Sequence, residues 1–339
     1  MGNWGQYASL VKKFRRIAWW ALAAGVLAFL IGPLLLPETT SGTMTEREAA
    51  GPDATFVEVN GLSVHYTSAP FQGDRSDAPL IVLLHGFGAS TYSWREVLEP
   101  LSAFGEVVAY DRPAFGFTER PVDQSEPSPY GVEAQLDLLQ AVIDEWAEPG
   151  QDVVLVGHSA GGTLAAEFAL RYPEEVSALV LVAPALLTGG GGPQWLSPLY
   201  AIPQIDRVGP RLVSSIASSG EELLERSWHD PSLLTPDIRA GYRAPLTVAG
   251  WERAFWEFQK APRSFQVTTS PESLSVPVLL ITGDDDRVVP TSDSLAVAEL
   301  LPSATLVVIP DSGHLPHEET PTDFMTAVAD GWEQIRSTR

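Results

Sequence analysis

The most informative part of this sequence is Gly157-His158-Ser159-Ala160-Gly161, which fits the pattern G-x-S-x-G. The preceding segment, 152–156, is rich in β-branched residues and predicts a buried strand. The following segment, 162–171, predicts a helix that ends at Tyr172-Pro173. A turn this sharp between strand and helix holds the central serine in a strained conformation and presents its hydroxyl above the sheet. We therefore predict that Ser159 is a nucleophile.

A serine nucleophile in this setting needs a histidine base and an orienting acid, and both are expected later in the chain. Segment 278–282 predicts a buried strand that leads toward Asp286, and 305–309 predicts another that leads toward His314. Open parallel sheets build their sites at such strand ends. We predict that His314 takes the proton of Ser159 and that Asp286 holds the imidazole tautomer and stabilises its charged form.

Three consecutive aspartates compete for the role of the acid. We choose Asp286 because it stands directly before 287–290, the segment that turns into the next helix. Asp284 and Asp285 are expected to cap or solvate the turn, which is the usual role of aspartates after a strand.

A glycine-containing loop predicts the oxyanion site. His85-Gly86-Phe87-Gly88 follows the apolar strand segment 80–84. The negative oxygen of a tetrahedral intermediate is stabilised by two preorganised backbone N–H groups. We expect these groups to belong to Phe87 and to Ala160, the residue after the nucleophile. The alternative is a glycine loop that only turns the chain.

The remaining histidines are assigned more ordinary roles. His158 fills a variable position of the motif, and His65 alternates within a predicted hairpin strand. His317 is expected to be structural or to lie at the rim of the site, and His229 to be an ordinary polar residue. His85 belongs with the oxyanion loop.

The order of predicted elements indicates the fold class. Strands and helices alternate along most of the 339 residues, which predicts a mostly parallel central sheet with helices on both faces. An initial hairpin is indicated by Asn60-Gly61, which suits a type I′ turn. The alternation stops in a stretch rich in proline, and we predict an inserted helical cap at about 184–275.

Taken together, the motifs resemble those of the α/β-hydrolase superfamily, in its branch of small-molecule ester and carbon–carbon bond hydrolases. The resemblance begins near Phe56 and extends to the C-terminus. Ala114 departs from it, because relatives often have glycine there. The resemblance implies an α/β-hydrolase fold with a helical cap over the site. It is carried by residues 85–88 with Trp94, by 110–118, by 157–161, by 283–290 and by Gly313-His314.

The N-terminus predicts a membrane anchor. Residues 17–36 are almost wholly apolar, and about twenty residues at ~1.5 Å each match the ~30 Å hydrocarbon core of a bilayer. Lys12, Lys13, Arg15 and Arg16 precede this run, and positive charge favours the cytoplasmic side. A secreted protein with a cleaved signal peptide is the alternative. The expected organisation is 1–16 cytoplasmic, 17–37 a single-pass transmembrane signal anchor, 38–53 a linker, and 54–339 an extracytoplasmic α/β-hydrolase domain.

Composition narrows the partners. A net charge of −22 and a pI near 4.5 argue against nucleic-acid binding. The sequence shows no metal-ligand spacing and no phosphate-binding glycine loop beyond the loop already assigned, so we expect no cofactor and no metal. The chain has no cysteine, which removes disulfide and thiol chemistry.

These observations predict a serine hydrolase that cleaves a carboxylic ester of a small or lipid-like substrate through an acyl-enzyme. A carbon–carbon bond hydrolase with the same triad is one alternative, although such relatives often carry tryptophan after the base histidine, where this chain has Leu315. A ligand sensor with vestigial turnover is another. Two roles remain open for Arg112, which could orient a substrate carboxylate or serve as a structural ion-pair partner.

Overall fold

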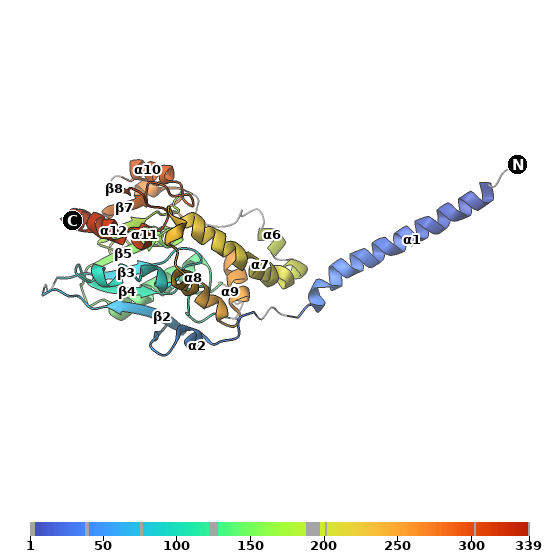
Figure 1. Ribbon diagram of the computed structural model, residues 1–339, viewed down its shortest axis with the longest axis horizontal. Coiled ribbons are helices and arrows are strands. Elements are labelled where there is room, and N and C mark those ends of the chain that lie inside the picture. The colour runs from blue at the N-terminus through green and yellow to red at the C-terminus, as the bar shows by residue number, and fades with distance from the viewer. Residues whose placement is uncertain are drawn as a thin grey trace.

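A mostly parallel sheet crosses the molecule in the computed structural model (Figure 1). The structure describes residues 4–37, 41–74, 77–121, 128–187, 197–200, 202–301 and 303–337. Within them the sheet has eight strands in the order β1-β2-β4-β3-β5-β6-β7-β8. β2 pairs antiparallel with β1 and β4, and all other pairs are parallel. The strands are β1 (Thr55–Val59), β2 (Leu62–Ala69), β3 (Leu80–Leu84), β4 (Glu106–Tyr110), β5 (Val153–His158), β6 (Ala178–Val182), β7 (Val278–Gly283) and β8 (Ala304–Ile309).

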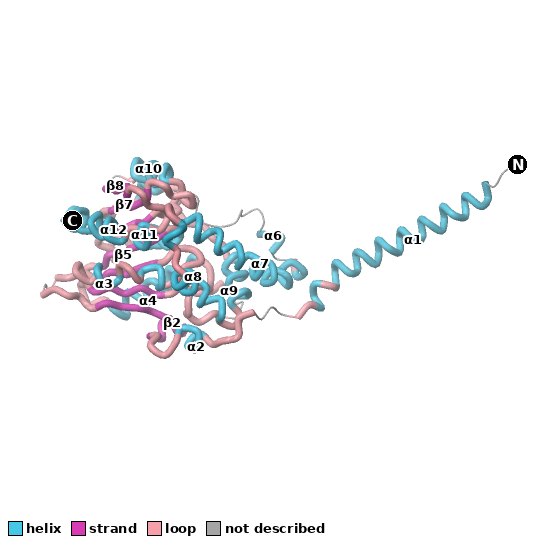
Figure 2. Tube along the Cα trace, viewed as in Figure 1, coloured by secondary structure: helices cyan, strands magenta, loops and turns pink. Residues whose placement is uncertain are grey.

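Helices cover both faces of this sheet, as Figure 2 shows. Successive side chains of a strand point to opposite faces, so Val82 of β3 joins one apolar cluster while Ile81 and Leu83 join the other. The first cluster includes side chains of α4 (Val132–Trp146), α5 (Ala160–Arg171) and α10 (Thr291–Leu300). The second includes side chains of α3 (Leu98–Leu101) and α12 (Pro321–Ser337). The predicted fold class is therefore confirmed.

The predicted hairpin is also present. Asn60 and Gly61 connect β1 to β2 with φ angles of +51° and +74°. A type I′ turn requires positive φ at both central residues. The turn thus fixes the register in which Val59 faces Leu62.

A helical cap is inserted between β6 and β7. Its longest helix, α7, packs against α9, and Val213, Trp251 and Trp256 form an apolar cluster between them. Asp206 of α7 accepts hydrogen bonds from Trp256 Nε1 at 2.9 Å and from Lys260 Nζ at 2.6 Å. The cap elements are α6 (Ser197–Tyr200), α7 (Pro203–Ser227), η4 (Pro231–Leu233), α8 (Pro236–Arg243), η5 (Ala244–Thr247), α9 (Trp251–Lys260) and η6 (Pro271–Ser273).

The N-terminal helix α1 (Trp4–Ile31) extends away from the rest of the molecule (Figure 1). Within it, Ser9–Ile31 is long and apolar enough to cross a membrane, and it is not buried against the protein. Such a helix is compatible with a membrane anchor and with a signal sequence. Helix α1 begins before the predicted transmembrane span of 17–37 and ends at Ile31, before the short helix η1 (Pro33–Leu35). The other short helices are α2 (Glu46–Ala50), η2 (Thr91–Trp94) and α11 (Pro316–Glu319).

Candidate active site

Ser159 lies in the turn between β5 and α5 with φ +51° and ψ −118°. Positive φ is strained for a residue with a side chain and persists only where the surroundings enforce it. Here strand and helix pack too closely for larger residues. A Cβ added to Gly157 would lie 2.6 Å from Gly162 Cα, and one added to Gly161 would lie 2.3 Å from Leu84 O. The glycines of the motif thus hold the serine in its strained position.

His314 and Asp286 lie together at neighbouring strand ends. His314 Nδ1 donates to Asp286 Oδ2 at 2.7 Å, and both side chains are buried. The other carboxylate oxygen, Oδ1, accepts hydrogen bonds from the backbone N–H groups of Val288 (2.8 Å) and Val289 (2.9 Å). The turn after β7 therefore fixes the carboxylate, and the carboxylate fixes the imidazole with Nε2 free of this bond.

The two neighbouring aspartates have other partners. Asp284 Oδ1 accepts a weak hydrogen bond from the backbone N–H of Ser312 at 3.3 Å. Asp285 pairs with Arg287 and accepts from His229 Nδ1 at 2.9 Å. Among the three candidates, Asp286 is the one whose side chain reaches His314.

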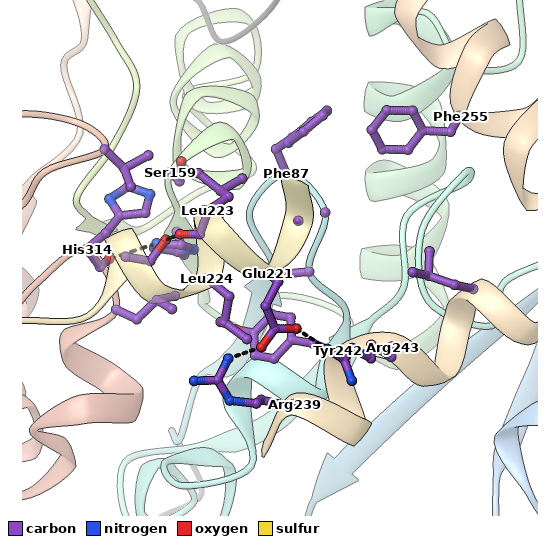
Figure 3. Close-up of a pocket in the computed structure, with 18 of the residues that line it drawn as sticks. Phe87, Ser159, Glu221, Leu223, Leu224, Arg239, Tyr242, Arg243, Phe255 and His314 are labelled. Carbon is purple, nitrogen blue, oxygen red and sulfur yellow. Dashed lines mark hydrogen bonds and ion pairs between the residues drawn. The ribbon is translucent and has the colours of Figure 1, made fainter. Parts of the chain in front are cut away.

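Ser159 and His314 face one cavity of about 440 Å³ between the sheet and the cap. Figure 3 shows them next to each other on one side, and Phe87 lies between them and Phe255 of α9 in this view. The rings of Phe87 and Phe255 contact each other edge to face, with their centroids 5.2 Å apart. Most of the lining is apolar: Phe87, Val213, Leu223, Leu224, Leu246, Trp251, Phe255, Val288 and Leu315. A polar group lies at the other end, where Glu221 of α7 pairs with Arg239 and Arg243 of α8. Such a cavity suits a mainly apolar molecule with a polar end.

The loop after β3 runs directly beside the serine turn. A Cβ added to Gly86 would lie 2.6 Å from His158 Nδ1 and 3.3 Å from Ser159 Cβ. Phe87 therefore lines the same cavity as Ser159, and Ala160 is the first residue of α5. The structure thus brings both predicted oxyanion residues to the nucleophile.

His85 holds this loop from behind. Its Nδ1 donates to Gly86 O at 2.8 Å, and its Nε2 accepts from the backbone N–H of Arg112 at 3.0 Å. Burial, together with the positive charge of Arg112, lowers the pKa of His85 to about 3. The side chain is therefore a neutral structural link.

Arg112 is buried and does not line the cavity. Its Nη1 donates to Gln135 Oε1 at 3.1 Å and its Nη2 to Gly86 O at 3.3 Å. The sequence left two roles open for Arg112. Its position outside the cavity disagrees with the first, which is to orient a substrate carboxylate. The structural role holds, but the partners are neutral oxygens instead of the expected carboxylate.

The loop that follows β4 accounts for the contact of His65 and for the departure from glycine at Ala114. Asp111 accepts hydrogen bonds from His65 Nδ1 (2.8 Å) and from the backbone N–H groups of Thr91 (2.6 Å) and Phe117 (2.7 Å). Burial alone would raise the pKa of Asp111, but His65 and the backbone N–H of Phe117 hold it below the ordinary value. Ala114 adopts φ +76°, a conformation that glycine adopts without steric cost. This geometry accounts for the glycine that relatives often have there.

Two buried histidines lie close to His314, and no local pattern in the sequence indicates their contacts. His158 Nε2 donates to the carbonyl oxygen of His314 at 3.0 Å, and the two rings are 4.6 Å apart. His317 Nε2 donates to Ser93 Oγ at 2.9 Å. His317 is therefore structural, one of its two expected roles, and His158 supports the backbone of the base.

Glu318 is a further buried group that sequence reasoning missed. It accepts hydrogen bonds from Ser93 Oγ at 2.6 Å, from Arg95 Nη1 at 2.5 Å and from the Tyr242 hydroxyl of cap helix α8. Burial raises the pKa of Glu318, although Arg95 opposes this shift. The carboxylate joins the cap to the core beneath the cavity. In the sequence, the one indication of a role for Glu318 is its position shortly after His314.

Comparisons with known proteins agree with this fold. The α/β hydrolase fold family matches residues 79–321. The chain is 30% identical to the uncharacterized hydrolase YugF of Bacillus subtilis, over 84% of this chain and 98% of that protein. It is also 30% identical to the 2-hydroxy-6-oxo-2,4-heptadienoate hydrolase of Pseudomonas putida, over 74% of this chain and 87% of that protein. The crystal structure of a membrane phospholipase A has the same fold, with a TM-score of 0.62 and 24% identity over 96% of this chain and 99% of that one. The chain therefore belongs to the α/β hydrolase fold family. The family and these relatives support a hydrolase activity for this chain.

Proposed function

We propose that this protein is a serine hydrolase that cleaves a carboxylic ester of a small or lipid-like molecule through an acyl-enzyme. One observation carries the proposal: strained Ser159 and Asp286-bound His314 face the same apolar cavity. A base oriented by a buried acid beside a serine that lines the cavity is the arrangement that activates the nucleophile.

In the proposed reaction, Ser159 Oγ attacks the ester carbonyl while His314 Nε2 takes its proton. The backbone N–H groups of Phe87 and Ala160 stabilise the oxyanion. His314 then protonates the leaving alcohol, and water releases the acid by the reverse sequence. Asp286 stabilises the imidazolium that forms.

The shape of the cavity supports an amphipathic ester. An acyl chain can contact the apolar wall near Phe87 and Phe255, while the other end of the cavity offers the charged side chains of Glu221, Arg239 and Arg243. Since the cavity holds about 440 Å³, we expect medium acyl chains to be preferred over acetyl.

We further propose that α1 is a single-pass anchor, with its N-terminus cytoplasmic and the hydrolase domain across the membrane. The cap is tied to the segment that follows α1. Arg207 donates to Leu36 O at 3.0 and 2.8 Å, and Arg211 donates to Pro37 O at 2.7 Å. The same helix, α7, lines the cavity through Val213. These contacts support a cap held near the membrane, where a lipid-like substrate would be found; the phospholipase of the same fold is itself described as a membrane protein.

A carbon–carbon bond hydrolase is the second candidate, because the heptadienoate hydrolase of Pseudomonas putida is similar over most of its length. The same three side chains would serve that reaction. Leu315 argues against it, since it lines the cavity where such relatives often have tryptophan.

The test is hydrolysis of p-nitrophenyl esters from acetyl to palmitoyl by the full-length protein in detergent, beside Ser159→Ala. We expect turnover with a medium-chain optimum, and a loss of about 10³-fold or more in kcat for the variant. Equal activity of both proteins would refute the nucleophile. If neither turned over these esters while the first cleaved a 2-hydroxy-6-oxo-dienoate, the second candidate would replace the first.

Membrane attachment is tested separately. Full-length protein should stay in the membrane fraction after alkaline carbonate extraction, and protease added outside intact cells should reach the hydrolase domain. Release of the full-length protein by carbonate would contradict the anchor.

A further inference from the structure

The Gly86 carbonyl and the Phe87 N–H belong to one peptide group. That group is planar and trans, so the two bonds point in opposite directions. Whatever holds the Gly86 oxygen therefore also aims the Phe87 N–H. The orientation of this proposed oxyanion donor can thus be traced to the partners of the carbonyl.

Two buried side chains bind that oxygen, and the backbone N–H of Ala89 donates to it at 3.4 Å. His85 Nδ1 donates to it at 2.8 Å and Arg112 Nη2 at 3.3 Å. The arginine is itself held, because its Nη1 donates to Gln135 Oε1 at 3.1 Å, and Gln135 Nε2 donates to Tyr130 O at 3.1 Å. The carbonyl is thereby fixed on the side away from the cavity.

The charge of Arg112 is unusual in its surroundings. In the part of the chain that the structure describes, no ion pair joins it to a carboxylate, and burial lowers its pKa to about 10. A buried cation without a carboxylate partner is unfavourable for folding. Its guanidinium donates to the Gln135 side chain and to the Gly86 carbonyl, and a cation at this carbonyl can polarise the peptide whose N–H faces the other way. Hydrogen bonds on both sides of a peptide group strengthen each other.

We propose that Arg112 is a positioning residue for the oxyanion site: its guanidinium holds and polarises the Gly86–Phe87 peptide so that the Phe87 N–H is aimed at the developing oxyanion. This inference rests on the proposed serine mechanism. It assigns the arginine a part in transition-state stabilisation although it lies outside the cavity.

A matched comparison is available within the chain. Arg120 is also buried and also donates to backbone carbonyls, Gly116 O at 2.7 Å and Pro245 O at 3.3 Å, but it does not contact the loop 85–88. Arg112→Met and Arg120→Met each remove one buried guanidinium and keep a similar apolar stem. Only the first removes the contact with the oxyanion peptide.

The experiment measures kcat, KM and inhibition by an alkyl trifluoromethyl ketone, whose adduct with serine carries an oxyanion. Active sites are counted by complete labelling with a fluorophosphonate. Loss of a whole oxyanion donor costs about 10²–10³ in kcat, so misaiming one should cost about 10-fold or more. For Arg112→Met we expect kcat per active site to fall by this factor, while KM changes by less than about threefold. The Ki of the ketone should rise in proportion to the fall in kcat/KM. For Arg120→Met we expect unchanged kcat per active site.

The proposal is overturned if Arg112→Met keeps its kcat per active site, or if Arg120→Met loses as much. Should Arg112→Met fail to fold, Arg112→Lys and Gln135→Leu decide: both should lower kcat severalfold and weaken the ketone, and unchanged values would reject the positioning role. These outcomes are separate from failure of the proposed function, which would appear as activity that survives Ser159→Ala.

Discussion

The two walls of the cavity are built in different ways. On the core wall, Ser159, His314 and the loop 85–88 follow the ends of parallel strands, and close glycine packing and buried side chains hold their backbone in place. On the cap wall, α7, α8 and α9 meet the cavity through side chains, and their mutual contacts are apolar rings and ion pairs. Groups that must be placed within fractions of an ångström benefit from the rigid wall, whereas side chains that select a substrate can vary on the other. Substitutions should therefore affect kcat on the core wall and KM or stability at the cap.

The largest effect is expected on the core wall for Asp286→Asn. The amide keeps the shape of the side chain but disfavours the imidazole tautomer that accepts the serine proton, and it cannot stabilise the imidazolium. We expect kcat to fall by about 10⁴-fold with a small change in KM, measured with the preferred p-nitrophenyl ester. Asp284→Asn is the matched control and should retain most activity. Equal losses in both variants would place the acid elsewhere.

The next effect tests how closely the core wall is packed. Gly86→Ala adds a methyl group 2.6 Å from His158 Nδ1, and His158 supports the backbone of His314. Overpacking of this kind costs about 1–3 kcal/mol of stability. We expect kcat to fall by about 10²-fold, since displacing a catalytic group by ~1 Å costs that much. Thermal unfolding and kinetics on the same sample measure both; a variant with normal kcat would show that the loop can shift without harm.

The same difference between the two walls determines how much of each wall can be predicted from the sequence. Ser159, Asp286, His314 and the loop 85–88 can be predicted as candidate site residues because each follows an apolar strand within a few residues. The role of Glu318 could not be predicted because its partners lie far away in the chain: Ser93 is 225 residues distant and Tyr242 is 76. No local pattern records such a contact. The cap could be located where the alternation stops, but the pairing of its helices depends on tertiary packing.

Between the walls, Glu318→Gln tests the contact that joins cap to core. Burial raises the pKa of Glu318 above its ordinary value, so the folded state binds this proton more tightly than the unfolded state does. Its stabilising contribution is complete below the unfolded pKa and is lost as pH rises through the higher folded pKa. Glutamine stays neutral at every pH. We expect the variant to gain stability relative to the parent protein as pH rises above the ordinary carboxyl range, measured by urea unfolding at several pH values. A difference that stays constant with pH would mean that the pKa of Glu318 is not raised.

The smallest effect is expected on the cap wall for Arg243→Ala. Arg243 pairs with Glu221, but 63% of its side chain is exposed, and exposed ion pairs contribute only about 0–1 kcal/mol. The unfolding free energy should therefore change by less than about 1 kcal/mol. Because Arg243 lines the polar end of the cavity, KM should rise for esters whose alcohol part is anionic and stay nearly constant for neutral p-nitrophenyl esters. A fall in kcat for the neutral esters would contradict the division of roles, since it would tie an exposed cap residue to the chemistry performed on the core wall.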